Sequence, residues 1–106
     1  MESPKATVHA KADGVYAVSC SGEFGQNTIG QLAATCDGID AGAKLVVLDV
    51  KNVTFADSSF LNTLIRLRSS RRLVLQGPLP GQLYRLLQLT GALALFPLRN
   101  GGAPAS

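Results

Sequence analysis

One short apolar run constrains the fold of this chain more than any other feature of its sequence. The run Lys44–Val50 is almost continuously apolar until Asp49, and Gly42 and polar residues bound it. At this length, such a run is typical of a strand that is covered on both faces. Strands of this kind belong mainly to parallel sheets flanked by helices. We therefore expect an α/β domain.

The elements around this strand are predicted to alternate. Two alternating segments joined by Asp13-Gly14 predict a β-hairpin over residues 7–21. Helical spacing of apolar residues predicts helices near 29–36, 58–68 and 83–89, and a second buried strand lies at 73–75. The predicted order is β-β-α-β-α-β-α, with or without a last strand within 93–98. This order indicates a mixed, mostly parallel sheet of four or five strands with helices packed on it.

Candidate capping residues suggest where the first predicted helix begins and ends. Asn27 or Thr28 could cap its start, and Gly38 could end it. The loops that follow the strands are expected at residues 22–28, 52–59 and 76–80. In open sheets of this kind, binding sites gather where the carboxyl ends of strands meet the amino ends of helices.

Length and composition predict a single folded domain. The chain has 106 residues, of which 46% are hydrophobic, so it has room for one core. We expect this domain to span residues 1–98 and the tail 99–106 to be disordered, because the tail lacks periodicity. The first residues lack the basic start and apolar core of a signal peptide, and no apolar run is long enough to cross a bilayer. We therefore expect a cytoplasmic protein.

The two cysteines are expected to be structural. Cys20 and Cys36 do not form a Cys-x-x-Cys pair, and each is predicted on a different apolar element. Free buried thiols are the expected state in a reducing compartment, rather than a disulfide.

The sequence offers little for catalysis or cofactor binding. His9, the single histidine, lies on the first predicted strand, and nothing suggests that it approaches Ser58 or Ser59 to form a triad. No residue spacing resembles a metal site or a phosphate-binding glycine motif. We therefore expect a protein that is not an enzyme and that uses no metal or cofactor.

Four arginines, Arg66, Arg68, Arg71 and Arg72, are concentrated near the end of the second predicted helix. They suit the negative end of a helix dipole, and such a group is usually a solvated face. No aromatic platform for stacking bases lies beside them. We therefore expect no direct contact with nucleic acid.

The turn Asp57-Ser58-Ser59 delivers two hydroxyls to the predicted start of a helix. Free N–H groups and the helix dipole stabilise negative charge at such a place, which favours the addition of a phosphate. The turn also has an ordinary interpretation, in which Asp57 or Ser58 simply caps the helix.

Three segments in the same order resemble the STAS domains, the family of bacterial anti-sigma factor antagonists. The first is the apolar strand leading to Asp57-Ser58-Ser59, which is similar to the family's Asp-Ser-(Ser/Thr)-Gly-Leu. The second, Ser21–Thr28, is similar to its Gly-Glu-Leu-Asp-x-x-Thr, and the third is Gln88-Leu89-Thr90-Gly91-Ala92 through Phe96. The likeness covers about residues 7–98.

The resemblance implies a function and a site. An antagonist of this family binds an anti-sigma factor that is also a serine kinase, and so frees the sigma factor. By this likeness the kinase phosphorylates Ser58, beside Asp57 and Ser59, and the modified antagonist is released. The expected partner-binding residues are Glu23, Phe24, Gly25, Gln26, Asn27, Thr28, Phe60 and Asn62.

Two departures from the family pattern lie near this site. Phe60 replaces the family's glycine, and Gly25 replaces an acid. Phe60 either turns into the core or faces outward, where it could anchor a partner or obstruct a kinase.

Two other functions remain open from the sequence. The first is a non-phosphorylated structural STAS subunit of a lipid-transport or stress-sensing complex, which an outward Phe60 would suit. The second is a small-ligand or nucleotide binder at the switch point of the sheet, for which the sequence has no phosphate-binding motif.

Overall fold

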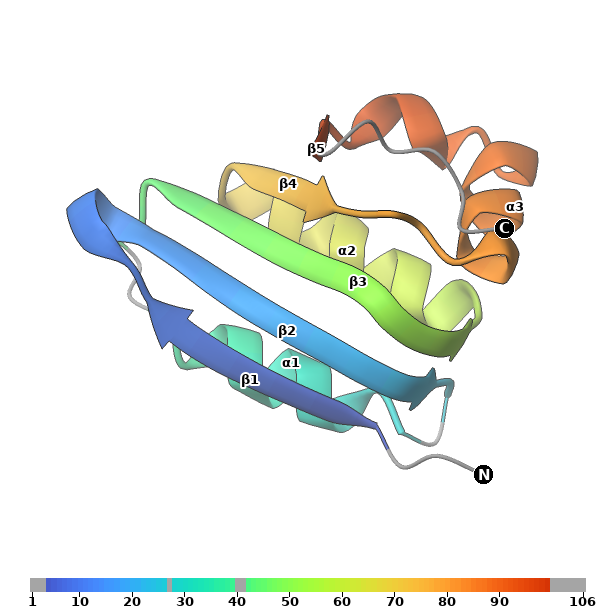
Figure 1. Cartoon of the computed structure of the whole chain (residues 1–106), viewed down its shortest axis with the longest axis horizontal. Coiled ribbons are helices and arrows are strands. Elements are labelled where there is room, and N and C mark those ends of the chain that lie inside the picture. Colours follow the sequence, from blue (N-terminus) through green and yellow to red (C-terminus); the bar gives the residue numbers. More distant parts are fainter. Residues whose placement is uncertain (1–3, 27, 40–41, 100–106) are drawn as a thin grey trace.

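The computed structural model describes residues 4–26, 28–39 and 42–99, which form one five-stranded sheet with helices (Figure 1). The strands run in the spatial order β1-β2-β3-β4-β5, with bounds Lys5–Ala10, Val15–Phe24, Leu45–Ala56, Leu73–Gln76 and Leu98–Arg99. β1 pairs with β2 antiparallel, and every other neighbouring pair is parallel. The predicted mixed, mostly parallel sheet is confirmed.

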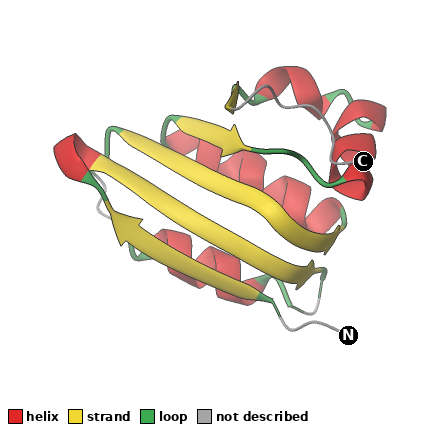
Figure 2. Cartoon of the chain, in the orientation of Figure 1, coloured by secondary structure: helices red, strands yellow, loops and turns green. Residues whose placement is uncertain are grey.

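The helices α1 (Gly30–Asp37) and α2 (Ser58–Ser70) lie behind β1–β4, whereas α3 (Gly81–Leu89) lies beyond β4 (Figures 1 and 2). Two short 3-10 turns, η1 (Ala12–Gly14) and η2 (Ala92–Leu95), complete the described elements. The predicted order is confirmed, including a last strand. That strand is shorter than expected because η2 takes up the first part of its predicted range.

The hairpin between β1 and β2 forms as the Asp-Gly dipeptide predicted. Asp13 and Gly14 both have positive φ angles, 63° and 77°, and the amide of Lys11 donates to the carbonyl of Val15 at 2.7 Å. Aspartate and glycine tolerate this left-handed conformation better than most residues. The hairpin places β1 at the edge of the sheet.

The core lies between the sheet and the helices. Its largest fully buried side chains include Phe24, Phe60, Leu48, Leu64 and Leu83. Burial of these apolar groups supplies most of the favourable free energy of folding.

Both cysteines lie in this core as free thiols, Cys20 on β2 and Cys36 on α1. Desolvation raises the pKa of the Cys36 thiol to about 11, and it raises the pKa of Cys20 still further. Both thiols therefore stay protonated at neutral pH and pack as small apolar groups. The prediction of free buried cysteines is confirmed.

β3 is longer than the sequence predicted. It continues past Val50 to Ala56 because its second half pairs with the end of β2, through register shifts between Ser19 and Ser21 and between Gly22 and Glu23. Phe24 and Ala56 become partners at the end of this pairing. The loops expected at 22–28 and 52–59 are therefore shorter, and they leave the sheet side by side.

The predicted tail is described only at its start. Arg99 belongs to β5 and pairs with Gln76, so it is not part of a disordered tail. Residues 100–106 lie outside the described part of the chain. Among the described residues, no helix is both long enough and apolar enough to span a bilayer.

Candidate functional site

Asp57 joins the two segments that leave the sheet at the ends of β2 and β3. Its Oδ1 accepts a hydrogen bond from the amide of Ser59 at 2.9 Å, which caps α2. Its Oδ2 accepts one from the amide of Gln26 at 3.2 Å, in the loop after β2. The amide of Asp57 also donates to the carbonyl of Phe24 at 3.3 Å. Asp57 is therefore both an ordinary helix cap and a link between the two segments.

The loop after β2 is held in a compact turn by Thr28. The Thr28 hydroxyl accepts a hydrogen bond from the amide of Gly25 at 2.9 Å and donates to the carbonyl of Glu23 at 3.1 Å. The amide of Ile29 donates to the carbonyl of Gly25 at 2.9 Å.

The start of α1 differs from the sequence-based expectation. Ile29 occupies the capping position and makes no capping hydrogen bond with its side chain. Thr28 does not cap the helix because its hydroxyl is engaged within the loop, so that prediction is wrong. The other predicted cap, Asn27, lies outside the described residues. Gly38 ends the helix as predicted.

Ser58 is the first residue of α2 and is exposed. Its hydroxyl makes no hydrogen bond to any residue that the structure describes. Asn62, which lies one turn later on the same helix face, is also exposed. Ser59 is only half-buried, and its carbonyl accepts from the Thr63 hydroxyl at 3.0 Å. The arrangement leaves the Ser58 hydroxyl accessible at the positive end of a helix dipole.

Phe24 and Phe60 form an aromatic pair beneath this surface. Their ring centroids lie 5.5 Å apart, and both side chains are completely buried. Phe60 therefore turns into the core, the first of its two interpretations. The assignment of Phe24 and Phe60 as partner-binding residues is corrected, because neither ring has surface that a docked protein could contact. They instead support the loop and the start of α2 from inside.

Gly25 permits the close approach of the loop to Asp57. A Cβ atom at this position would lie 3.3 Å from Oδ2 of Asp57, closer than most such contacts. A larger side chain would force the carboxylate or the loop to shift. This proximity gives a physical reason for glycine where the family pattern has an acid.

Gln82 belongs to this site, although no sequence pattern singled it out. Its Oε1 accepts from the amide of Ala56 at 2.9 Å, and its Nε2 donates to the carbonyl of the same residue at 2.7 Å. The side chain thus continues the hydrogen bonding of β3 where β4 has already ended. A polar residue in the first turn of α3 is the sequence signal, and it is too common to be diagnostic.

Phe55 is a second residue that sequence reasoning missed. Its side chain is 41% exposed, and it is the register partner of Glu23 at the ends of β3 and β2. The sequence predicted a loop at 52–59, so the strand position of Phe55 was not recognised. In a strand that extends to Ala56, successive side chains point to opposite faces of the sheet, so Phe55 would be expected to point away from the face that buries Ala56.

The structure brings most of the predicted site residues to one end of the sheet. The loop residues 23–26 and 28 lie beside Asp57 and the start of α2, as the hydrogen bonds of Asp57 and Thr28 require. Among the described residues, no group of three or more His, Cys, Asp or Glu side chains is arranged to hold a metal ion. The site is an exposed polar surface with one aromatic side chain.

The sequence matches no family model and no curated protein. Solved structures do match. An anti-sigma factor antagonist from Mycobacterium paratuberculosis is 28% identical, with a TM-score of 0.77 over 92% of this chain and 86% of that one. The anti-sigma factor antagonist SpoIIAA in its unphosphorylated form is 17% identical, with a TM-score of 0.71 over 91% of this chain and 89% of that one.

The phosphorylated form of SpoIIAA, a Bacillus cell fate determinant, has the same fold. It is 16% identical to this chain, with a TM-score of 0.68 over 91% of this chain and 92% of that one. The order of the elements, the mixed sheet and these likenesses agree with the resemblance drawn from the three sequence motifs. The chain therefore has the fold of these anti-sigma factor antagonists, as its resemblance to the STAS domains predicted.

Proposed function

We propose that this chain is an anti-sigma factor antagonist that binds a serine kinase-type anti-sigma factor and so releases the sigma factor. The observation that carries the proposal is the exposed Ser58 at the start of α2, beside a loop that Asp57 holds in place. The 28% identity to the mycobacterial antagonist supports the same role.

The surface around Ser58 suits a protein partner. At the same end of the sheet, Phe55 presents an aromatic side chain that is 41% exposed, and aromatic side chains that become buried often dominate the binding energy of interfaces. Glu23, Gln26 and Asn62 add polar groups at the same end of the sheet.

Phosphorylation of Ser58 supplies the proposed switch. The kinase transfers the γ-phosphoryl group of ATP to Oγ of Ser58, which loses its proton, and ADP leaves. The product carries about two negative charges next to the Asp57 carboxylate and within the docked surface. Repulsion and desolvation that cost about 3 kcal/mol would weaken the complex by more than about 100-fold.

The test mixes the full chain with kinase-fold anti-sigma factors and ATP. We expect a complex, release of sigma factor, and an intact-mass increase of one phosphate that Ser58→Ala abolishes. Ser58→Ala should keep its affinity, and Ser58→Asp should lose it. The neighbouring Ser59→Ala is the matched control and should still be phosphorylated.

The possible outcomes separate the two parts of the proposal. If no complex forms and no sigma factor is released, antagonism is refuted. If the complex forms but Ser58 stays unmodified, only the switch is refuted. Equal affinity of the Ser58→Ala and Ser58→Asp variants would place Ser58 outside the interface.

The structural-subunit alternative loses its main support. It was favoured by an outward-facing Phe60, and Phe60 is completely buried. Co-purification with an ABC-transporter ATPase instead of an anti-sigma kinase would revive it.

A further inference from the structure

The sheet has one long edge that the Ser58 site does not use. Among the described strands, β1 is the first in the spatial order and pairs with β2 alone, so its other side is open (Figure 1). An open strand edge presents backbone N–H and C=O groups that can pair with an added strand. The opposite edge strand, β5, has only two residues and offers much less backbone for such pairing.

The hairpin hydrogen bonds indicate which residues of β1 have backbone groups that point outward. The amide of Lys11, which follows β1, donates to the carbonyl of Val15 in β2 at 2.7 Å. In an antiparallel pair, hydrogen-bonded and non-hydrogen-bonded residue pairs alternate along the strands. The odd-numbered residues of β1 therefore bond toward β2, and three residues direct their N–H and C=O groups away from it: Ala6, Val8 and Ala10.

The odd-numbered positions carry a basic stripe, made of Lys5, His9 and Lys11. All three residues are exposed, and strand alternation puts their side chains on one face of the sheet. That face is the one that α1 and α2 leave uncovered, because Ala6, on the opposite face of β1, packs against the core (Figure 1). No acidic residue belongs to β1.

A hollow beside the basic stripe suits a carboxylate. It has a volume of about 240 Å³, and its lining includes polar side chains from three strands: Lys5, Thr7, His9, Ser19, Ser21 and Asn52. These side chains offer an ammonium group, an imidazole, three hydroxyls and an amide, and no acid lines the hollow. None of them forms a side-chain hydrogen bond or an ion pair with a residue that the structure describes.

One acid on the same face opposes the attraction of a carboxylate. Asp49 on β3 is the register partner of Ser19, so it lies two strands from β1, a distance of about 10 Å. Its carboxylate forms an ion pair with Lys51 at 3.6 Å, which partly neutralises its charge. A carboxylate at the outer edge would therefore meet the basic stripe before it met Asp49.

A second copy of this chain is poorly suited to the edge. In the antiparallel arrangement that joins the most residues, two copies of β1 would meet at Val8. Lys5 of each copy would then lie opposite Lys11 of the other. Like charges directly opposite one another destabilise a sheet, and lysine on an edge strand commonly prevents self-association. The charges favour an acidic partner instead.

We propose that β1 binds an extended acidic segment of another protein, which adds to the sheet as an antiparallel sixth strand. Acids at every second position of this segment lie opposite the basic stripe, and one of them enters the hollow. Apolar residues between the acids exchange backbone hydrogen bonds with Ala6, Val8 and Ala10. The Val8 side chain is 41% exposed and gives these residues an apolar contact. The proposal does not depend on antagonism of a sigma-factor regulator.

The test titrates the ¹⁵N-labelled full chain with a short capped peptide in which glutamate and valine alternate. We expect amide shifts centred on residues 5–11, slower hydrogen exchange at the amides of Ala6, Val8 and Ala10, and affinity that falls as salt is added. A peptide of the same composition with its glutamates in one block should bind about tenfold more weakly, because it cannot place acids on one face and valines on the other.

Methylated peptides separate strand addition from charge attraction. In the proposed register, the backbone nitrogens of the valines donate to β1, and those of the glutamates point away from it. N-methylation of the valines should therefore abolish the amide shifts. N-methylation of the glutamates is the matched control and should change the affinity by less than about threefold.

Two substitutions test the chain's own contribution to binding. Lys5→Glu reverses one charge of the basic stripe and should weaken binding of the alternating peptide by about fivefold. Arg85→Glu is its control, because Arg85 is exposed on α3, beyond β4, and should change the affinity by less than about twofold. Val8→Pro removes an outward N–H and should abolish binding, since proline is tolerated on an edge strand where its nitrogen faces solvent. If Val8→Pro does not fold, the methylated peptides measure the same contact.

Several results would overturn the proposal. They are the absence of amide shifts at millimolar peptide, shifts centred on residues 57–62 or 68–74, equal binding of the two methylated peptides, and equal losses from Lys5→Glu and Arg85→Glu. Shifts at β1 that grow with protein concentration in the absence of peptide would assign the edge to a second copy. An oligothymidylate that binds as tightly as the alternating peptide would assign the basic stripe to nucleic acid.

Discussion

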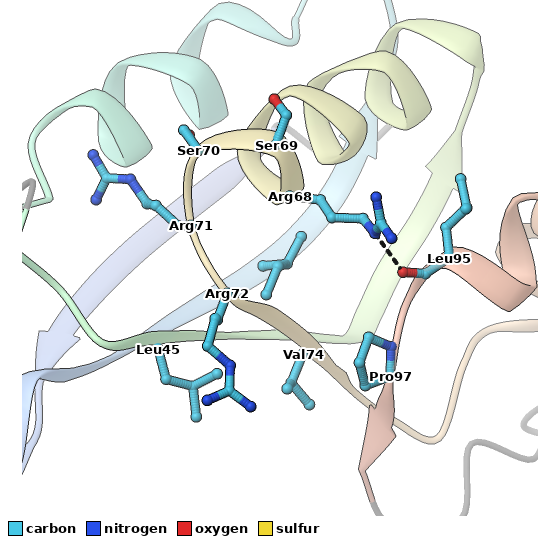
Figure 3. A pocket seen from close by; sticks show the side chains of 10 residues that line it. Leu45, Arg68, Ser69, Ser70, Arg71, Arg72, Val74, Leu95 and Pro97 are labelled. Atoms are coloured by element: carbon cyan, nitrogen blue, oxygen red, sulfur yellow. Dashed lines mark hydrogen bonds between the residues drawn. The ribbon is translucent and has the colours of Figure 1, made fainter.

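The two ends of α2 use their polar groups in different ways. At the amino end, Asp57 and Gln82 bond to the backbone of segments distant in sequence, and Thr28 closes the loop beside them. At the carboxyl end, the side chain of Arg68 makes one such bond (Figure 3), and the side chain of Arg72 makes none to the described residues. The amino end is a surface of fixed geometry, whereas the carboxyl end offers charge with less fixed positions.

This difference indicates what each end can recognise. A surface that is already ordered loses less conformational entropy when a protein docks on it. Long arginine side chains that are only partly fixed lose more when they bind. The following substitutions test the comparison between the two ends.

The largest effect is expected from the core beneath the amino end. Phe60→Ala removes a completely buried ring that packs on Phe24, and such substitutions usually cost about 3–5 kcal/mol. The free energy of unfolding in urea would measure this loss. Phe55→Ala is the control, because its ring is 41% exposed, and it should cost less than about 1 kcal/mol. Similar losses for both would contradict the inward orientation of Phe60.

A smaller effect is expected at Gln82. Gln82→Ala removes two hydrogen bonds to Ala56 and should lower the free energy of unfolding by about 1–2 kcal/mol. Amide shifts should concentrate at Ala56 and the start of α2. Gln88→Ala, at an exposed position on the same helix, should leave both measurements unchanged. If the two variants behave alike, Gln82 does not hold the end of β3.

The smallest effect is expected at the carboxyl end. Arg72→Gln should change the free energy of unfolding by less than about 0.5 kcal/mol, because the side chain is exposed and makes no ion pair with a described residue. Thermal and urea unfolding would both measure it. A loss above about 1 kcal/mol would show that the Arg72 side chain stabilises the fold and would weaken the contrast between the two ends.

The parts of the fold that the sequence predicted depend on local signals. Asp13-Gly14 predicted the hairpin turn, the apolar run at 44–50 predicted a central parallel strand, and helical spacing predicted the helices. The Asp57 cap was also among the expected interpretations. Each of these follows from a few neighbouring residues.

The features that were missed depend on contacts between distant segments. β3 extends to Ala56 because β2 continues alongside it, and no local pattern shows where a partner strand ends. Gln82 reaches Ala56 across 26 residues. The direction of Phe60 was undecided because its burial depends on the position of Phe24. Neither the length of the β2–β3 pairing nor the space that buries Phe60 can be predicted from the residues at one position of the sequence.

The shared carboxylate of Asp57 has one further consequence. Each of its oxygens accepts from a different segment, and one of these donors, Gln26, precedes it by 31 residues. A dianion added to the adjacent residue would compete for both donors together. One covalent event could then alter two structural elements simultaneously, with no need for the helix itself to unwind or rotate.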